Sequence, residues 1–145
     1  MDDGPLPTAA DFVADTAVER VGPGVYRCEL SGRWNAAVRW MRFRRTPSSP
    51  DGSLDPLALV ALSDTMPPAI GQRLGPGSPF FFAPSCDLTA HVFATTCEEW
   101  LLLRARCRRA GEGYASGECE IWSCDGHLLV YATQLMYLRL GRLPG

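Results

Sequence analysis

The sequence lacks the signatures of several common enzyme classes. It has two histidines, and its six cysteines form no Cys-x-x-Cys pair and have no histidine cluster beside them, so we expect no metal site. No glycine-rich phosphate loop occurs, and no Gly-x-Ser-x-Gly turn presents a nucleophilic serine. We therefore expect no nucleotide or other cofactor and no chemistry of the serine-hydrolase type.

Strong charge and long hydrophobic runs are also missing. The formal net charge is −2 and the pI is about 5.6, which gives no general attraction to nucleic acid or to an anionic membrane. No apolar run approaches the length of a transmembrane helix, and the acidic N-terminus shows no signal-peptide core. The sequence therefore predicts a cytoplasmic protein whose cysteines stay reduced and serve as small core residues.

What is present is the composition of one globular domain. The chain has 145 residues, of which 46% are hydrophobic and 21% are charged, and this is enough for one well-formed core. Residues 1–12 are polar and contain proline, and we expect them to form a flexible tail. The whole chain, 1–145, is predicted to be a single domain.

The segment 54–74 is the predicted centre of the fold. Leu57 to Leu62 are apolar on every side, which indicates a helix that is buried all round. Asp55 is its expected N-cap, and the paired prolines near its other end are expected to end or kink it. Asp64 lies inside this hydrophobic segment, and a buried carboxylate needs a hydrogen-bonding partner from elsewhere in the fold.

The rest of the chain predicts antiparallel strands. Alternating apolar and polar residues mark the strands, and turn residues separate them. Loops are expected at 46–53 and, as a long irregular crossing, at 71–84. The expected strands are 16–21, 25–30, 38–44, 85–93, 99–108, 114–123 and 127–139.

Turn residues predict the register of the last three strands. A two-residue Asp-Gly turn at 125–126 pairs Gly117 with Gln134, and the loop at 111–113 pairs Cys107 with Gly117. One face of these strands is then apolar and suited to wrap the helix. It comprises Leu101, Leu103, Ala105, Cys107, Cys119, Ile121, Leu128, Val130 and Ala132.

Charged residues occupy the other face in this register. Arg104 lies opposite Glu120 and Arg106 opposite Glu118, so we expect cross-strand ion pairs rather than a basic groove for phosphates. Four further arginines have no such expected partner and are weak candidates to bind the phosphates of coenzyme A: Arg39, Arg42, Arg44 and Arg45.

Gln134 is the one amide on the apolar face. It lies opposite Gly117, which has no side chain and leaves room for it. A core-facing amide must find partners, and Asp64 is the one carboxylate of the predicted buried helix. The pair is either a hydrogen bond that fixes the helix on the sheet or part of a functional site, and the pattern leaves both open.

An antiparallel sheet wrapped around one central helix is the α+β hotdog arrangement, and here the sequence resembles the TesB-like acyl-CoA thioesterases. The matching segments look like the second of the two hotdog repeats usual in that family. Because the chain holds only one repeat, the resemblance implies a homodimer of double-hotdog form. The segments span about 38–139 and are VRWMRFR, DPLALVALSDTMPPA, PSCDLTAHVF, EEWLLLRARCRRAGEGYASGECEIWSCDGHLLVYATQ and Tyr137-Leu138-Arg139.

The resemblance also implies a catalytic set. The family uses an Asp, a Thr or Ser, and a Gln to orient a hydrolytic water, and the matching residues are Asp64 in LSDTMPP, Ser85 in PSCDLT and Gln134 in ATQ. Simple alternation places Ser85 on the polar face of its strand. Ser85 therefore reaches the site only if that strand begins irregularly or with a bulge.

The implied reaction is hydrolysis of an acyl-CoA or acyl-carrier-protein thioester, with coenzyme A or phosphopantetheine entering as part of the substrate. Asp64 is the expected general base, with covalent attack by Asp64 as a variant, and backbone N–H groups near a helix N-terminus are the expected donors to the carbonyl. Weaker candidates for the acyl pocket, of a kind that more often belongs simply to the core or to a dimer interface, are Trp40, Met66, Phe80, Phe81, Phe82 and Gly117.

Two other functions stay open at this point. Hotdog domains also host dehydratase or cyclase-type eliminations on carrier-bound intermediates, and a single domain can act as a non-catalytic acyl-binding module. Elimination leaves the thioester intact, and a binding module binds acyl-CoA without turnover, so product analysis distinguishes the three.

Overall fold

The computed structural model describes residues 18–22, 25–28, 36–43 and 45–141, and the predicted tail lies outside these ranges. The helices are α2 (Pro56–Ser63) and α3 (Pro67–Leu74). The strands are β1 (Val18–Gly22), β2 (Val25–Cys28), β3 (Ala36–Met41), β4 (Phe81–Phe82), β5 (Thr89–Val92), β6 (Leu101–Gly111), β7 (Tyr114–Trp122), β8 (Leu128–Tyr137) and β9 (Arg139–Leu140).

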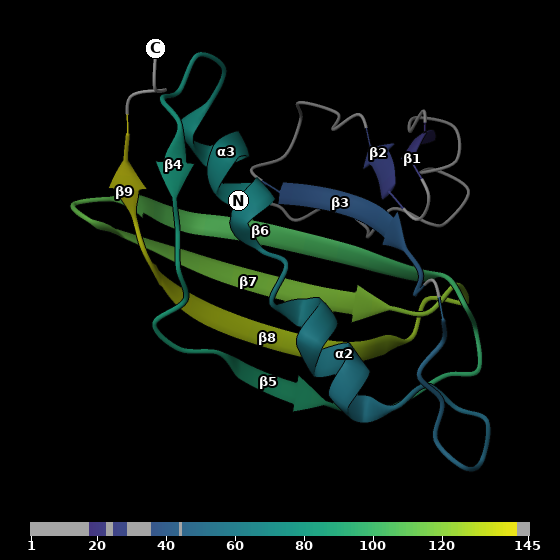
Figure 1. Ribbon diagram of the computed structural model, residues 1–145. Coiled ribbons are helices and arrows are strands. Elements are labelled where there is room, and N and C mark those ends of the chain that lie inside the picture. The colour runs from purple at the N-terminus through teal and green to yellow at the C-terminus, as the bar shows by residue number, and fades with distance from the viewer. Residues whose placement is uncertain (1–17, 23–24, 29–35, 44, 142–145) are drawn as a thin grey trace.

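The main sheet is antiparallel and has the strand order β3-β6-β7-β8-β5. Both helices lie on the same face of this curved sheet, with α3 against β3, β6 and β7 and α2 against β5, β7 and β8 (Figure 1). The hairpin β1–β2 and the short pair β4–β9 form two further small sheets. The predicted α+β hotdog fold is confirmed.

The predicted register of β6, β7 and β8 is confirmed, although the turn is of another type. Gly117 pairs with both Cys107 and Gln134. Ser123 and His127 close a three-residue loop, in which the Ser123 N–H donates to the His127 carbonyl at 3.0 Å, the Gly126 N–H donates to the Ser123 carbonyl and Gly126 has φ 86°. A bulge beyond Ile121 absorbs the extra residue, which restores the predicted pairs and puts Leu129 in the core where Leu128 was expected.

The predicted central helix is two short helices. Asp55 accepts a hydrogen bond from the Leu57 N–H at 2.9 Å, so it is the N-cap as predicted. Pro67 and Pro68 begin α3, which extends to Leu74 into the segment expected to be irregular. The paired prolines therefore end the first helix, as predicted, but they also start a second one.

The prediction that the helix is buried all round is wrong. Leu59, Leu62 and Ser63 are buried, but Leu57 is 75% exposed, and Asp64 at the C-cap is also exposed. The helix is half exposed because α2 lies over the margin of the sheet, where its own chain covers only one side of the helix. Its uniformly apolar sequence leaves a hydrophobic face open.

The core fills the space between the sheet and the helices. The predicted apolar face lies there except for Leu128, together with residues of α2 and α3. Cys107 and Cys119 are buried as expected, whereas Cys86, Cys97 and Cys124 are exposed. Burial raises the pKa of the Cys119 thiol to about 12, so this thiol stays protonated.

The outer face of the sheet carries the charged residues. Arg104 and Glu120 form the predicted ion pair at 3.5 Å. Glu118 lies opposite Arg106 as predicted, and its carboxylate accepts hydrogen bonds from Arg108 Nε at 2.9 Å and Nη2 at 3.0 Å. Alternation along β6 places Arg108 on the same face as Arg104 and Arg106, and the register of the ladder shifts at Arg108, between Cys107 and Arg109.

The described residues contain neither a membrane-spanning helix nor a metal-binding cluster. None of the helices among them is long and apolar enough to cross a membrane. The same residues contain no group of three or more His, Cys, Asp or Glu side chains that could hold a metal ion.

Candidate active site

Gln134 comes from the centre of β8 and is only 3% exposed. The β7–β8 ladder places it opposite Gly117 on the face that carries the helices, as the register predicted. A buried amide held in a continuous ladder has a fixed position. Gln134 is therefore the rigid member of the site.

Asp64 comes from the break between the two helices. Its backbone N–H donates to the Ala61 carbonyl at 3.3 Å, which makes it the C-cap of α2. The next two residues, Thr65 and Met66, lead into the prolines of α3. The end of α2 therefore directs the carboxylate toward β8 while leaving it open to solvent on one side.

Ser85 reaches the site because its strand begins irregularly. The regular strand β5 starts only at Thr89, which pairs with Thr133, but Ser85 forms an isolated bridge with Met136. Four residues on this segment thus span three on β8, which is one extra residue. A slip of one residue turns a side chain to the opposite face, so Ser85 shares the face of Gln134.

The three side chains form one hydrogen-bonded triangle. Gln134 Nε2 donates to Asp64 Oδ1 and, at 2.7 Å, to Ser85 Oγ. Ser85 Oγ donates to the same Asp64 Oδ1 at 3.2 Å. Among the described residues, Asp64 Oδ2 accepts no hydrogen bond. The carboxylate is therefore oriented through one oxygen while the other is available for chemistry.

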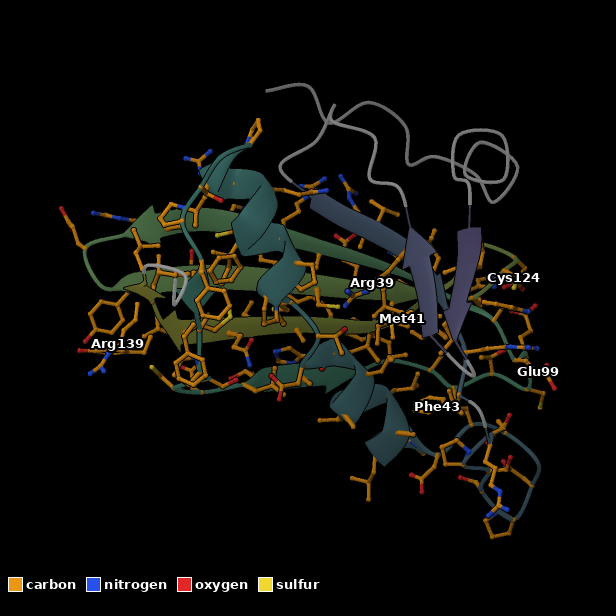
Figure 2. The ribbon with its side chains drawn as sticks, turned by 45° about the horizontal axis from the view of Figure 1, so that its top comes forward. Arg39, Met41, Phe43, Glu99, Cys124 and Arg139 are labelled. Atoms are coloured by element: carbon orange, nitrogen blue, oxygen red, sulfur yellow. The ribbon has the colours of Figure 1, made fainter. Side chains whose placement is uncertain are left out.

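Arg39 is part of the support of this site, which the sequence did not reveal. It was considered for phosphate binding, but its Nη2 donates to the Thr65 carbonyl, next to Asp64. Figure 2 shows Arg39 in the middle of the molecule, with Met41 and Phe43 further along the same segment, and both of these pack against the core. Because a charged donor stabilises an otherwise unpaired carbonyl, Arg39 holds the helix break against β3.

Met66 and Gly117 lie together behind the triangle. Met66 is fully buried, and a Cβ atom built on Gly117 would lie 2.7 Å from Met66 Sδ and 3.0 Å from Met136 Cε. The room that Gly117 leaves is therefore filled by methionine side chains. Met66 is a core residue in this state of the protein, two residues from the catalytic candidate Asp64.

The aromatic candidates for the acyl pocket are not gathered at the triangle. Trp40 alternates with Arg39 on β3, so it lies on the sheet face away from the helices. Phe81 packs against the core near Gly71, whereas Phe80 and Phe82 are 57% and 62% exposed beside β9. The alternation of residues along β3 could have excluded Trp40 from the acyl pocket. The pairing of β4 with β9, which places Phe80 and Phe82, could not be predicted from any pattern in the sequence.

Both histidines and Arg42 have partners outside the triangle, and Arg44 lies outside the described residues. His127 Nδ1 contacts Asp125 Oδ2 at 2.8 Å in the β7–β8 loop, and the His91 ring stacks on Phe93. Neither histidine therefore serves as a base for Ser85. Arg42 is paired with Glu99 at 3.7 Å and lies over the Trp100 ring at 4.8 Å.

Comparisons with solved structures found proteins of similar fold, two of which are described as thioesterases. A Streptococcus mutans protein bound to acetyl-CoA is 14% identical, with a TM-score of 0.64 over 79% of this chain and 89% of that one. A hypothetical thioesterase from Streptococcus pneumoniae with coenzyme A is 14% identical, with a TM-score of 0.62 over 88% and 91%. A thioesterase from Haemophilus influenzae is 16% identical, with a TM-score of 0.62 over 91% and 85%.

Comparison with curated proteins gave no match. Comparison with family models gave a match over residues 2–138, which is nearly the whole chain, to the acyl-CoA thioesterase C-terminal domain. This agrees with the thioesterase resemblance of the sequence and extends it to the N-terminal segment. The chain therefore belongs to the family of acyl-CoA thioesterase C-terminal domains.

Proposed function

We propose that this protein hydrolyses an acyl thioester of coenzyme A or of an acyl carrier protein. The observation that carries the proposal is the triangle of Asp64, Ser85 and Gln134, which brings together three segments far apart in the sequence at the open side of the helix–sheet junction. Family membership and the acetyl-CoA and coenzyme A bound to the structural neighbours support the substrate class.

In the proposed mechanism Asp64 is the general base. A water at the free Oδ2 loses a proton to the carboxylate as its oxygen attacks the thioester carbonyl carbon. Gln134 and Ser85 hold Oδ1 and keep the carboxylate in the attacking geometry. The tetrahedral intermediate then loses the thiolate, which takes the proton from Asp64, and the products are a carboxylic acid and a free thiol.

Among the described residues, the helix N-terminus nearest to the triangle offers no free N–H group to stabilise the oxyanion. The helix N-terminus nearest to Asp64 is that of α3, but Pro67 and Pro68 occupy its first positions and have no N–H group. The next N–H, that of Ala69, already donates to the Met66 carbonyl at 2.9 Å. We therefore propose that a second copy of the chain completes the site.

The exposed surface supports a homodimer. Strand β5 is at the edge of the main sheet, and Val92 and Phe93 at its end are 38% and 62% exposed. The open apolar face of α2, with Leu57, lies beside it. An apolar sheet edge next to an apolar helix face is typical of a subunit contact, because it is an aggregation hazard when left uncovered.

The dimer is tested by sedimentation equilibrium. We expect a mass of two chains, and Val92→Lys should shift it to one because it places a charge in the contact. Leu140→Lys, which changes an apolar residue of similar exposure on β9, is the matched control and should remain dimeric. A monomeric wild-type protein would refute the dimer.

The reaction is tested by thiol release from short, medium, long and aromatic acyl-CoAs, with the products identified by mass spectrometry. We expect a free thiol and the carboxylic acid in equal amounts. A product that still carries the thioester would show elimination instead. Tight binding of acyl-CoA without any product would show a binding module and refute hydrolysis.

A further inference from the structure

The segment between Ser85 and Thr89 is attached to β8 through an irregular set of contacts. The Pro84 carbonyl accepts from the Tyr137 N–H at 2.9 Å, and the Cys86 N–H donates to the Leu135 carbonyl at 2.8 Å. The Asp87 N–H lies 3.4 Å from the same Leu135 carbonyl. Two residues thus oppose one, which is the pattern of a β-bulge.

Asp87 supplies the hydrogen-bond acceptor that the bulge leaves missing. The N–H of Leu135 points to the bulged segment, and its acceptor is the Asp87 side chain, with Oδ1 at 2.8 Å. Asp87 and Leu135 therefore contact each other twice, once through the backbone and once through the carboxylate. Leu135 is the immediate neighbour of Gln134, so this contact is next to the triangle.

The position of the bulge determines on which face of the strand the Ser85 side chain lies. Without it, alternation from Thr89 back along the strand would put Ser85 on the outer face, as the sequence predicted. With it, the segment slips by one residue, and Ser85 Oγ turns to Gln134 and Asp64. The carboxylate of Asp87 is the side chain that satisfies the backbone donor left over by the slip.

We propose that Asp87 is a positioning residue for Ser85: its carboxylate fixes the slipped register and thereby holds the Ser85 hydroxyl on Asp64. This inference rests on the proposed function for its kinetic consequence, but its structural content does not depend on it. Asp87 accepts a hydrogen bond from Leu135 and forms none with the three side chains of the triangle, so its effect on catalysis passes through Ser85.

The kinetic test is a double-mutant cycle on kcat for acyl-CoA hydrolysis. Ser85→Ala removes a hydrogen bond to a charged group, and we expect kcat to fall roughly 10- to 100-fold. Asp87→Ala should lower kcat by a similar factor in the wild-type background but by less than about twofold in the Ser85→Ala background, because its target is then absent. Equal losses in both backgrounds would overturn the proposal.

Two further variants separate positioning from general stability. Asp87→Asn keeps an Oδ1 acceptor for the Leu135 N–H and should retain kcat within about threefold. Asp87→Glu keeps the charge but displaces the acceptor, so it should behave like Asp87→Ala and replaces that variant if it fails to fold. Asp51→Ala, which removes a comparable bond from an exposed Asp to the Ser53 N–H at 3.0 Å in a loop, is the matched control and should leave kcat unchanged.

A measurement without turnover keeps the two proposals distinguishable. If the wild-type protein hydrolyses no thioester, the proposed function fails, and the positioning role is judged by the side-chain amide signals of Gln134 in ¹H–¹⁵N spectra. Asp87→Ala should move these signals as Ser85→Ala does, and Asp51→Ala should not. Faster hydrogen exchange at the Leu135 amide with unmoved Gln134 signals would show that Asp87 is only structural, and would overturn the inference.

Discussion

The hairpins β6–β7–β8 and the bulged segment before β5 bring residues to the same site by different means. Gln134 lies in a continuous ladder, is nearly fully buried, and has its register set by the loop that joins β7 to β8. Ser85 is exposed, forms a single isolated bridge, and depends on a register that a side chain stabilises. A site can thus combine a rigid member with an adjustable one, and the two should respond differently to substitution.

The largest difference is expected in stability. Ile121 is fully buried in the hairpins, and Ile121→Ala should lower the free energy of unfolding by about 2–5 kcal/mol because it leaves a cavity. Leu57→Ala on the open face of α2 should cost less than about 0.5 kcal/mol in the monomer. Urea denaturation of both variants in the monomeric Val92→Lys background measures the contrast, and equal costs would mean that α2 is covered within one chain.

Gly117 and Gly71 give the next contrast. Gly117→Ala should cost about 1–3 kcal/mol, since its Cβ would meet Met66 Sδ at 2.7 Å and force the residue next to the helix break to move. Gly71→Ala meets only Phe81 at 3.6 Å within a helix, so it should stabilise the protein by about 0.5–1 kcal/mol. Thermal unfolding measures the sign of both changes in stability. A Gly117→Ala variant as stable as the wild type would mean that Met66 and Met136 move aside without cost.

The buried thiol of the hairpins predicts a pH effect. Because the folded-state pKa of Cys119 is about 12 and its ordinary value is 9.0, the protonated form is favoured in the folded state. The stabilisation is complete below pH 9 and is lost as the pH rises from 9 to 12, at roughly 1.4 kcal/mol per pH unit. Cys119→Ala should lack this slope in urea denaturation between pH 8 and 10.5, and identical slopes in the two proteins would contradict the prediction.

The smallest effect is expected on the outer face of the hairpins. Arg104 and Glu120 are partly exposed and 3.5 Å apart, so a double-mutant cycle should give a coupling energy below about 1 kcal/mol. The pair therefore adds little to the stability of the ladder. A coupling of several kcal/mol would mean that charge pairs, rather than core packing, hold the hairpins in register.

The same contrast explains which parts of the fold the sequence predicted. Hairpins are specified by neighbouring residues, so turn chemistry predicted the pairing of Gly117 with Gln134, although the turn at Gly126 is of another type and the bulge beyond Ile121 is needed to restore that pairing. The position of Ser85 was not predictable, because its bulge depends on a bond from Asp87 to a strand 48 residues away. Alternation predicted only that Ser85 would need an irregular or bulged strand start in order to turn inward.

The site itself was predicted in part. The pattern isolated Asp64 and Gln134 as partners, and their hydrogen bond is present. It also predicted burial of Asp64, which is wrong for a single chain, because an apolar helix sequence does not say whether its own chain or another one covers it. The role of Arg39 was missed, since nothing in the sequence indicates that an arginine on β3 reaches the carbonyl of Thr65.

The most direct test of the central claim is the rate of thiol release from acyl-CoA by Asp64→Asn. Asn keeps the size of the side chain and an Oδ1 acceptor for Gln134 and Ser85, but it cannot take a proton from water. We predict that kcat falls by about 10²–10⁴-fold while the unfolding temperature is unchanged. An Asp64→Asn protein that hydrolyses the thioester at the wild-type rate would contradict the account.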